Sequence, residues 1–147
     1  YVYGKANICY QQQDYYGVLE RIKPLRRIQG KFISLHLYLL HLKAIYLVYV
    51  ADDSDISTNR VRTVLSSFED AIEYNRKHRD YLYQLNIYED FCQLFRKLLT
   101  LYHQAIKSPF PQENRRFRTS WQELKNTVEY KKYPHRVWFS EQLVKLG

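Results

Sequence analysis

A chain of 147 residues is long enough for one domain with a substantial buried core, so it needs neither a disulfide framework nor a structural metal to fold. Its two cysteines, Cys9 and Cys92, favour a reducing, cytoplasmic location, and no Cys or His spacing is typical of zinc. The 23 Lys and Arg residues outnumber the 15 Asp and Glu residues and give a net charge of +8. This charge favours a polyanionic partner, either nucleic acid or an anionic membrane. Because no metal-ligand or phosphate-loop motif is present, we expect no cofactor and no metal. The alternative is that the excess charge only keeps a helical protein soluble.

The first third of the chain leads into one long apolar segment. Residues 1–13 have no helical periodicity and predict an irregular lead-in. Pro24 is well tolerated at a first helical position, so we expect it to begin a central helix over about 24–51. Residues 32–51 carry two apolar stripes, which predicts that different neighbours cover two faces of this helix. Its length approaches a bilayer span, but Lys43 near its middle argues against a membrane location.

Three amphipathic helices are predicted after the central one. They cover about 57–85, 88–107 and 113–130, with a break at the proline-containing segment 108–111. The tail, 134–147, has enough apolar residues to dock as a short helix. The sequence thus predicts an all-α fold, a helical bundle of four main helices plus a short C-terminal helix, in a single domain over 1–147.

Basic residues gather in two segments of the chain. One precedes the apolar part of the central helix, and the other surrounds the fourth main helix, where aromatic residues alternate with the basic ones. Such segments can bind phosphates and offer rings for base stacking. The alternative is that the basic residues form an ordinary solvated face. The candidate nucleic-acid-binding residues are Arg21, Lys23, Arg26, Arg27, Lys31, Arg115, Arg116, Arg118, Lys125, Lys131 and Lys132.

Two residues of the third main helix, Arg96 and His103, lie seven positions apart in RKLLTLYH and nearly on one face. Their spacing resembles the Arg-x4-6-His motif of the HEPN superfamily. This resemblance implies a small helical ribonuclease, usually dimeric, in which Arg96 and His103 would act on the RNA phosphodiester. A polar residue such as Asn often follows the arginine in that family, whereas Lys97 follows it here. A solvent-facing Arg and His on an amphipathic helix is the alternative.

Residues 56–71, ISTNRVRTVLSSFEDA, begin the second main helix. Ser57, Thr58, Val61 and Arg62 stand in a Thr-Thr/Ser-x-x-hydrophobic-Arg order. The segment resembles the amino-terminal helix signature of the small helical subunit of type III CRISPR effector complexes, which serve antiviral defence. This resemblance implies a small basic bundle, stacked along a larger complex, that contacts guide and target nucleic acid without catalysis. The long apolar helix ahead of the segment departs from that pattern.

The sequence therefore leads to one preferred function and two alternatives. The preferred function is a non-catalytic subunit or domain of a larger nucleoprotein assembly that binds the backbone of RNA or DNA through its basic segments. Other protein subunits of the assembly would then be partners, and the membrane would not. The alternatives are a HEPN-like ribonuclease and a structural protein–protein interaction domain that meets an acidic protein.

Overall fold

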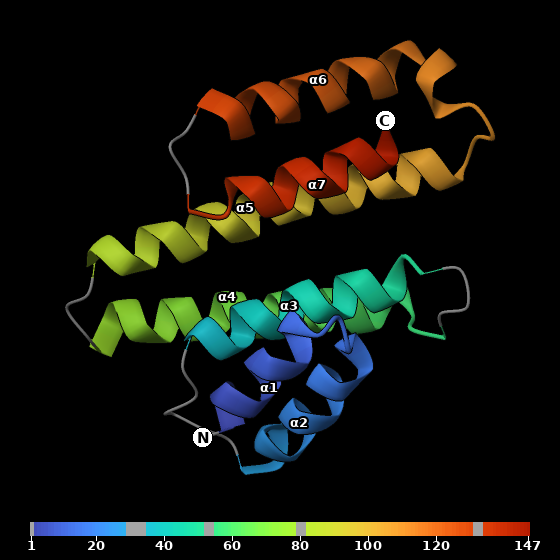
Figure 1. The fold of residues 1–147 in the computed structure, drawn as a ribbon. Coiled ribbons are helices and arrows are strands. Elements are labelled where there is room, and N and C mark those ends of the chain that lie inside the picture. The colour runs from blue at the N-terminus through green and yellow to red at the C-terminus, as the bar shows by residue number, and fades with distance from the viewer. Residues whose placement is uncertain (1, 29–34, 52–54, 79–81, 131–133) are drawn as a thin grey trace. The chain divides into compact units, whose positions relative to one another are not determined.

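The computed structural model describes residues 2–28, 35–51, 55–78, 82–130 and 134–147, and every regular element in these ranges is helical (Figure 1). The predicted all-α fold class is confirmed. The predicted number of helices is not, because the described residues form seven α-helices and one 3-10 turn instead of four main helices and a short one. The chain divides into two compact units, Tyr1–Tyr81 and Leu82–Gly147.

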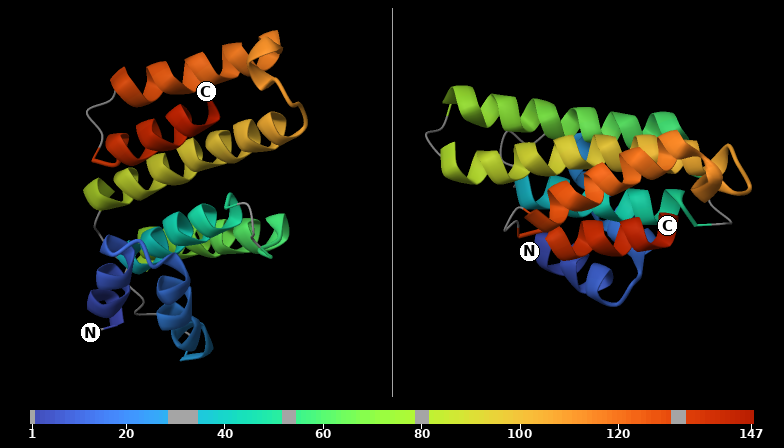
Figure 2. Two further views of the ribbon diagram at one scale, coloured as in Figure 1. Left: turned by 45° about the vertical axis from the view of Figure 1, so that its right-hand side comes forward. Right: turned by 90° about the horizontal axis from the view of Figure 1, so that it is seen from above.

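The first unit contains the helices α1 (Val2–Gln11), α2 (Tyr15–Ile28), α3 (Leu35–Tyr49) and α4 (Thr58–His78). Helix α3 packs against α1 and α2 on one side and against α4 on another (Figures 1 and 2). Nine of its fifteen residues are buried, including the polar His41. The prediction that different neighbours cover two faces of this apolar segment is therefore confirmed.

Side-chain contacts fix α4 along α3. The ring of Tyr38 stacks on that of Phe68, with the centroids 5.9 Å apart. At the other end of α3, the hydroxyls of Tyr49 and Thr58 share a hydrogen bond of 2.6 Å. In the part of the chain that the structure describes, no helix combines the length and the hydropathy needed to cross a membrane.

Two expectations for the beginning of the chain are wrong. Residues 2–11 form α1 instead of an irregular lead-in. Among the side chains of α1 that the structure describes, only Ala6 is buried, and one small buried residue leaves no apolar stripe in the sequence. Pro24 lies well inside α2 and does not begin a helix. Of the predicted central helix 24–51, residues 29–34 lie outside the described part.

The second unit contains α5 (Leu82–Ile106), the 3-10 turn η1 (Pro111–Glu113), α6 (Arg115–Tyr130) and α7 (Arg136–Leu146). Each of the three α-helices packs against the other two (Figure 2). The tail that was predicted to dock as a short helix forms α7. The predicted break between the third and fourth helices is confirmed, because α5 ends before the prolines and η1 begins at Pro111.

An aromatic cluster forms the core of this unit. Phe91 of α5 is fully buried, and its ring lies 4.9 Å from that of Phe139 and 5.7 Å from that of Trp138, both on α7. The ring of His135, just before α7, meets Phe91 edge-on at 5.4 Å. Phe117 of α6 is also fully buried. Rings from all three helices therefore contribute to the core that holds α6 in place.

The sequence predicts a boundary between the second and third amphipathic helices, with a turn at Asn86, and this prediction is also wrong, because α5 begins at Leu82 and runs through Asn86. Asn86 is exposed, and an exposed asparagine inside a helix costs only about 0.7 kcal/mol relative to alanine. The neighbouring Leu85 and Tyr88 are buried and keep the chain helical.

Candidate nucleic-acid interface

Helix α6 carries most of the candidate binding residues that the structure describes. Its start is fixed by Asn114, whose Oδ1 accepts hydrogen bonds from the backbone N–H groups of Arg116 (2.9 Å) and Phe117 (3.3 Å). Such a cap satisfies amide groups that have no partner within the helix. Phe117, Leu124 and Val128 form the buried stripe. The polar side of α6 is thereby turned away from the core of its unit.

Three arginines follow the cap within four residues. Arg115, Arg116 and Arg118 are all exposed, and none of them forms an ion pair with a residue that the structure describes. At about 100° per residue, Arg116 and Arg118 lie on opposite flanks of α6, with Arg115 between them. Guanidinium groups without carboxylate partners keep all their donors for a phosphate.

Arg115 and Arg118 border a shallow hollow on α6 of about 440 Å³. Its other lining residues are Thr119, Gln122, Glu123 and Asn126. Gln122 Nε2 donates a hydrogen bond of 2.8 Å to Asn126 Oδ1, which leaves the amide nitrogen of Asn126 available as a donor. The hollow therefore combines two cations, one carboxylate and neutral polar groups on one helix face.

Lys125 occupies the flank of α6 that faces α7. Its Nζ lies 5.2 Å from the centroid of the Trp121 ring, a cation–π contact. Trp121 in turn donates a hydrogen bond from Nε1 to the carbonyl of Leu143 in α7 (2.9 Å). The ring of Trp121 is thus used for packing between helices, and Lys125 is partly held by it.

A second concave site lies between α5 and α6 and has a volume of about 640 Å³. We call it the α5–α6 groove. Arg96, Lys97 and Thr100 form its α5 wall, and Ser120, Glu123, Asn126 and Thr127 form its α6 wall. Leu101 and Leu124, each 2% exposed, form the floor. The groove thus has a basic wall facing a polar wall that carries one carboxylate.

The structure places both residues of the HEPN-like motif on α5. Arg96 is exposed and lines the α5–α6 groove. His103 is half-buried, lies beside Tyr102 with the ring centroids 5.9 Å apart, and does not line the groove. The two residues share a helix face but stand about 10.5 Å apart along the axis.

The other candidate residues are described only in part. Arg21 is exposed on α2, in the first unit. The side chains of Lys23, Arg26 and Arg27, and the whole of Lys31, Lys131 and Lys132, lie outside the described part of the structure. The groove residues Lys97, Thr100, Ser120 and Thr127 were not predicted from the sequence. They form a site only because α5 packs against α6, and amphipathic periodicity does not identify which helices pair.

The segment 56–71 has the helix start that its sequence suggests. Ser57 precedes α4, and its Oγ accepts a hydrogen bond of 3.2 Å from the backbone N–H of Arg60. Val61 is fully buried, whereas Arg60 and Arg62 are exposed. This arrangement explains the order of residue types as capping followed by an amphipathic turn.

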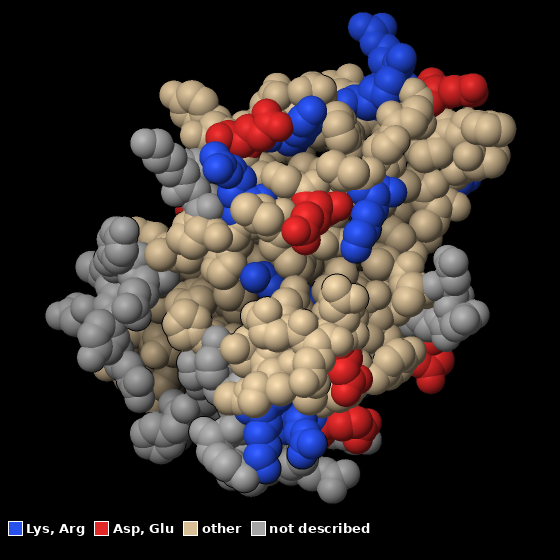
Figure 3. Space-filling view, in the orientation of Figure 1, with Lys and Arg blue, Asp and Glu red and all other residues tan. Residues whose placement is uncertain are grey.

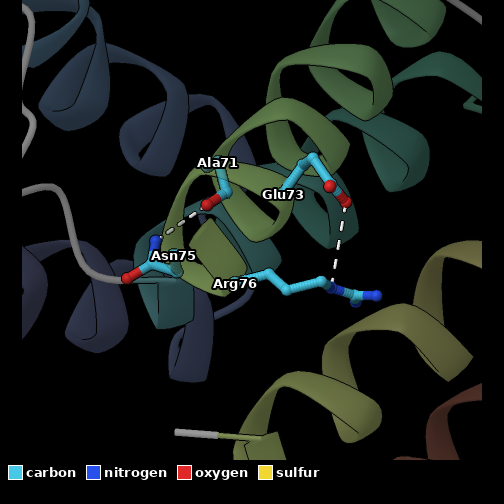
Figure 4. A network of polar contacts seen from close by, with 4 residues as sticks. All are labelled: Ala71, Glu73, Asn75 and Arg76. Atoms are coloured by element: carbon cyan, nitrogen blue, oxygen red, sulfur yellow. Dashed lines mark hydrogen bonds and ion pairs between the residues drawn. The ribbon is translucent and has the colours of Figure 1, made fainter. Parts of the chain in front are cut away.

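Charge is mixed over α6 and α7 on one face of the molecule. On the face drawn in Figure 3, the Lys and Arg side chains over α6 and α7 lie among Asp and Glu side chains. At the end of α4, Arg76 pairs with Glu73 (3.8 Å) and Asn75 donates to the carbonyl of Ala71 (2.7 Å), so polar groups there contact their own helix (Figure 4). The start of α6 differs in having three neighbouring arginines without an ion pair to any described residue.

Comparison with models of known protein families, with curated proteins and with solved structures finds no match to this chain. What the α6 surface does is therefore inferred from its residues and geometry.

Proposed function

We propose that this chain is a non-catalytic helical subunit or domain of a nucleoprotein assembly, and that it binds the backbone of nucleic acid through the basic surface of α6. The observation that carries this proposal is the exposed cluster of Arg115, Arg116 and Arg118 directly after the Asn114 cap. No described residue forms an ion pair with any of the three.

The surroundings of the cluster support a phosphate ligand. Unpaired arginines on a surface keep their forked donor geometry for phosphate oxygens, and releasing counterions from the nucleic acid adds to affinity. Thr119, Gln122 and Asn126 provide neutral polar groups beside Arg115 and Arg118. The net charge of +8 favours encounter with any polyanion.

A place in a larger assembly is proposed from the resemblance of residues 56–71 to the small helical subunit of CRISPR effector complexes. Exposed apolar side chains support a protein partner as well. Val137 and Val144 of α7 are 64% and 74% exposed and lie seven residues apart, on one face of the helix.

Fluorescence anisotropy with labelled single-stranded RNA and DNA, at several salt concentrations, tests the binding. We expect affinity to fall steeply as salt rises and to depend little on base sequence. Changing Arg115, Arg116 and Arg118 together to Gln removes three phosphate contacts. It should weaken binding by about tenfold or more and reduce the magnitude of the slope of log K against log salt by about 2, since each contact to a single strand contributes about 0.7.

A charge-matched variant controls for net charge. Lys77, Arg136 and Lys145 are exposed, and changing them together to Gln removes the same charge outside α6. Its affinity should stay within about threefold of the unmodified chain, because none of the three side chains lines the hollow or the groove, and exposed charges are screened by salt. Equal losses in both variants would show a general charge effect, and binding that ignores salt would contradict the proposal.

A further inference from the structure

The hollow on α6 and the α5–α6 groove adjoin each other. Glu123 and Asn126 line both of them. The far side of the hollow carries Arg115 and Arg118, and the far side of the groove carries Arg96 and Lys97. A ligand that follows this path meets cations at both ends and crosses the width of one helix, about 10–12 Å. An extended, negatively charged chain fits such a path better than a compact anion does.

The middle of the path is negatively charged, unlike its two ends. Glu123 is exposed and places a carboxylate between the two pairs of cations. An ionised carboxylate only accepts hydrogen bonds and repels phosphate. A ligand that occupies the whole path must therefore present a donor, and not a phosphate, where it passes Glu123.

Two threonine hydroxyls of the groove have the same preference for a donor. Thr100 Oγ1 donates to the carbonyl of Arg96 (3.0 Å), and Thr127 Oγ1 donates to the carbonyl of Glu123 (2.9 Å). Because each hydroxyl proton is used within its own helix, the oxygens face the groove only as acceptors. Three acceptors near one another suit a ligand that carries hydroxyl donors between its phosphates.

We propose that the hollow and the α5–α6 groove form one path for a single strand of RNA, and that Glu123 distinguishes RNA from DNA by accepting a hydrogen bond from a ribose 2′-hydroxyl. This inference rests on the proposed function. The 2′-hydroxyl is the donor that RNA has and DNA lacks along the backbone. Arg115, Arg118, Arg96 and Lys97 bind the flanking phosphates.

Three ligands with the same base test the role of the 2′ position. They are an oligouridylate of about 12 nucleotides, its 2′-deoxy counterpart and its 2′-O-methyl counterpart. The unmodified chain should bind the 2′-hydroxyl form about tenfold more tightly than the other two, since only that form can donate at this position. Glu123→Ala should bind all three with similar affinity. Glu129→Ala, an exposed carboxylate of α6 that lines neither site, should keep the preference.

The possible outcomes separate this inference from the proposed function. If Glu123→Ala strengthens binding to all three ligands equally and their ratio stays unchanged, Glu123 only repels phosphate and the inference is wrong. Equal binding of the 2′-hydroxyl and 2′-deoxy forms by the unmodified chain also overturns it, while salt-sensitive binding would leave the proposed function standing. Tight binding of the 2′-O-methyl form would show that sugar conformation, and not donation, is recognised. If the unmodified chain binds none of the three ligands, both this inference and the proposed function are wrong.

The path itself has a separate test. Changing Arg96 and Lys97 together to Gln should weaken binding of the oligouridylate by about tenfold, because two phosphate contacts are lost at one end. Changing Arg136 and Lys145 together to Gln removes the same charge from exposed side chains of α7 that line neither site, and should have little effect. An unchanged affinity after the first substitution would exclude the α5–α6 groove from the binding site.

Discussion

The indole Nε1 of Trp121 donates a hydrogen bond of 2.9 Å to the main-chain carbonyl of Leu143, so a side chain of α6 holds the last turn of α7. Gln112 adds a second link, because its Nε2 donates to the carbonyls of Leu146 (3.2 Å) and Gly147 (3.0 Å). The two Gln112 bonds satisfy carbonyl groups at the end of the helix, whereas the Leu143 carbonyl also accepts the backbone N–H of Gly147 (3.0 Å). The position of α6 thus depends on α7 as well as on α5.

Replacing Trp121 with Phe tests this link. Phenylalanine keeps a ring for Lys125 and for packing but removes the donor to Leu143. We expect the free energy of unfolding to fall by about 1 kcal/mol. Urea unfolding followed by circular dichroism measures the change. Tyr130→Phe, at a side chain that is 92% exposed, is the control and should leave the midpoint unchanged. No loss in the Trp121 variant would mean that the bond does not stabilise the unit.

A substitution in the aromatic core of the second unit should lower the free energy of unfolding by more than Trp121→Phe does. Phe91 is fully buried and contacts the rings of Phe95, Trp138 and Phe139. Phe91→Ala should lower the free energy of unfolding by about 3–5 kcal/mol, through lost burial and the cavity that remains. Thermal unfolding should then show early melting of the second unit. Val144→Ala, at an exposed position of α7, should change stability by about 0.5 kcal/mol or less.

Whether a helix of this protein can be located from the sequence depends on how many apolar side chains it buries. The helices α4, α5 and α6 have continuous apolar stripes, and their approximate positions follow from spacing. Helix α1 buries only Ala6 among its described side chains, so periodicity does not reveal it. Pro24 predicts a helix start locally, but α2 continues through it, and α2 as a whole packs against α1 and α3.

The candidate site, too, can be predicted from the sequence only in part. Arg115, Arg116 and Arg118 can be identified from the sequence because they are adjacent and basic. The α5–α6 groove cannot, since Arg96 and Glu123 come together only through the pairing of two helices. Arg96 lines this groove and His103 does not, although only seven positions separate them on the same helix.

Two glycines offer a matched comparison in the first unit. A Cβ added at Gly4 meets nothing, so Gly4→Ala should stabilise α1 by roughly 0.5–1 kcal/mol through its better helix propensity. A Cβ at Gly17 would collide with the carboxylate of Asp14, which accepts the capping hydrogen bond from the Gly17 N–H (2.9 Å). Gly17→Ala should therefore gain less, or lose stability. Melting temperatures of the two variants check the order, and a larger gain at Gly17 would contradict it.

The cap of α6 links stability to binding. Asn114→Ala removes the acceptor for the N–H groups of Arg116 and Phe117. We expect a loss of about 1 kcal/mol in stability and fraying of the turn that carries the three arginines. Hydrogen exchange should speed up at residues 115–118, and affinity for RNA should fall modestly. Asn114→Asp restores an acceptor and should restore slow exchange, but its negative charge should still weaken RNA binding.

The positions of Arg96 and His103 predict that the pure chain does not cleave RNA. Acid–base work on a phosphodiester needs the histidine within hydrogen-bonding reach of the reacting oxygen, and His103 is half-buried beside Tyr102, outside the groove that Arg96 lines. Incubation of labelled single-stranded RNA with the chain, resolved on a denaturing gel, should show intact substrate. His103→Ala should bind RNA as the unmodified chain does, whereas Arg96→Gln should bind it less tightly. Cleavage that His103→Ala abolishes would establish a ribonuclease of the HEPN type and contradict the non-catalytic function.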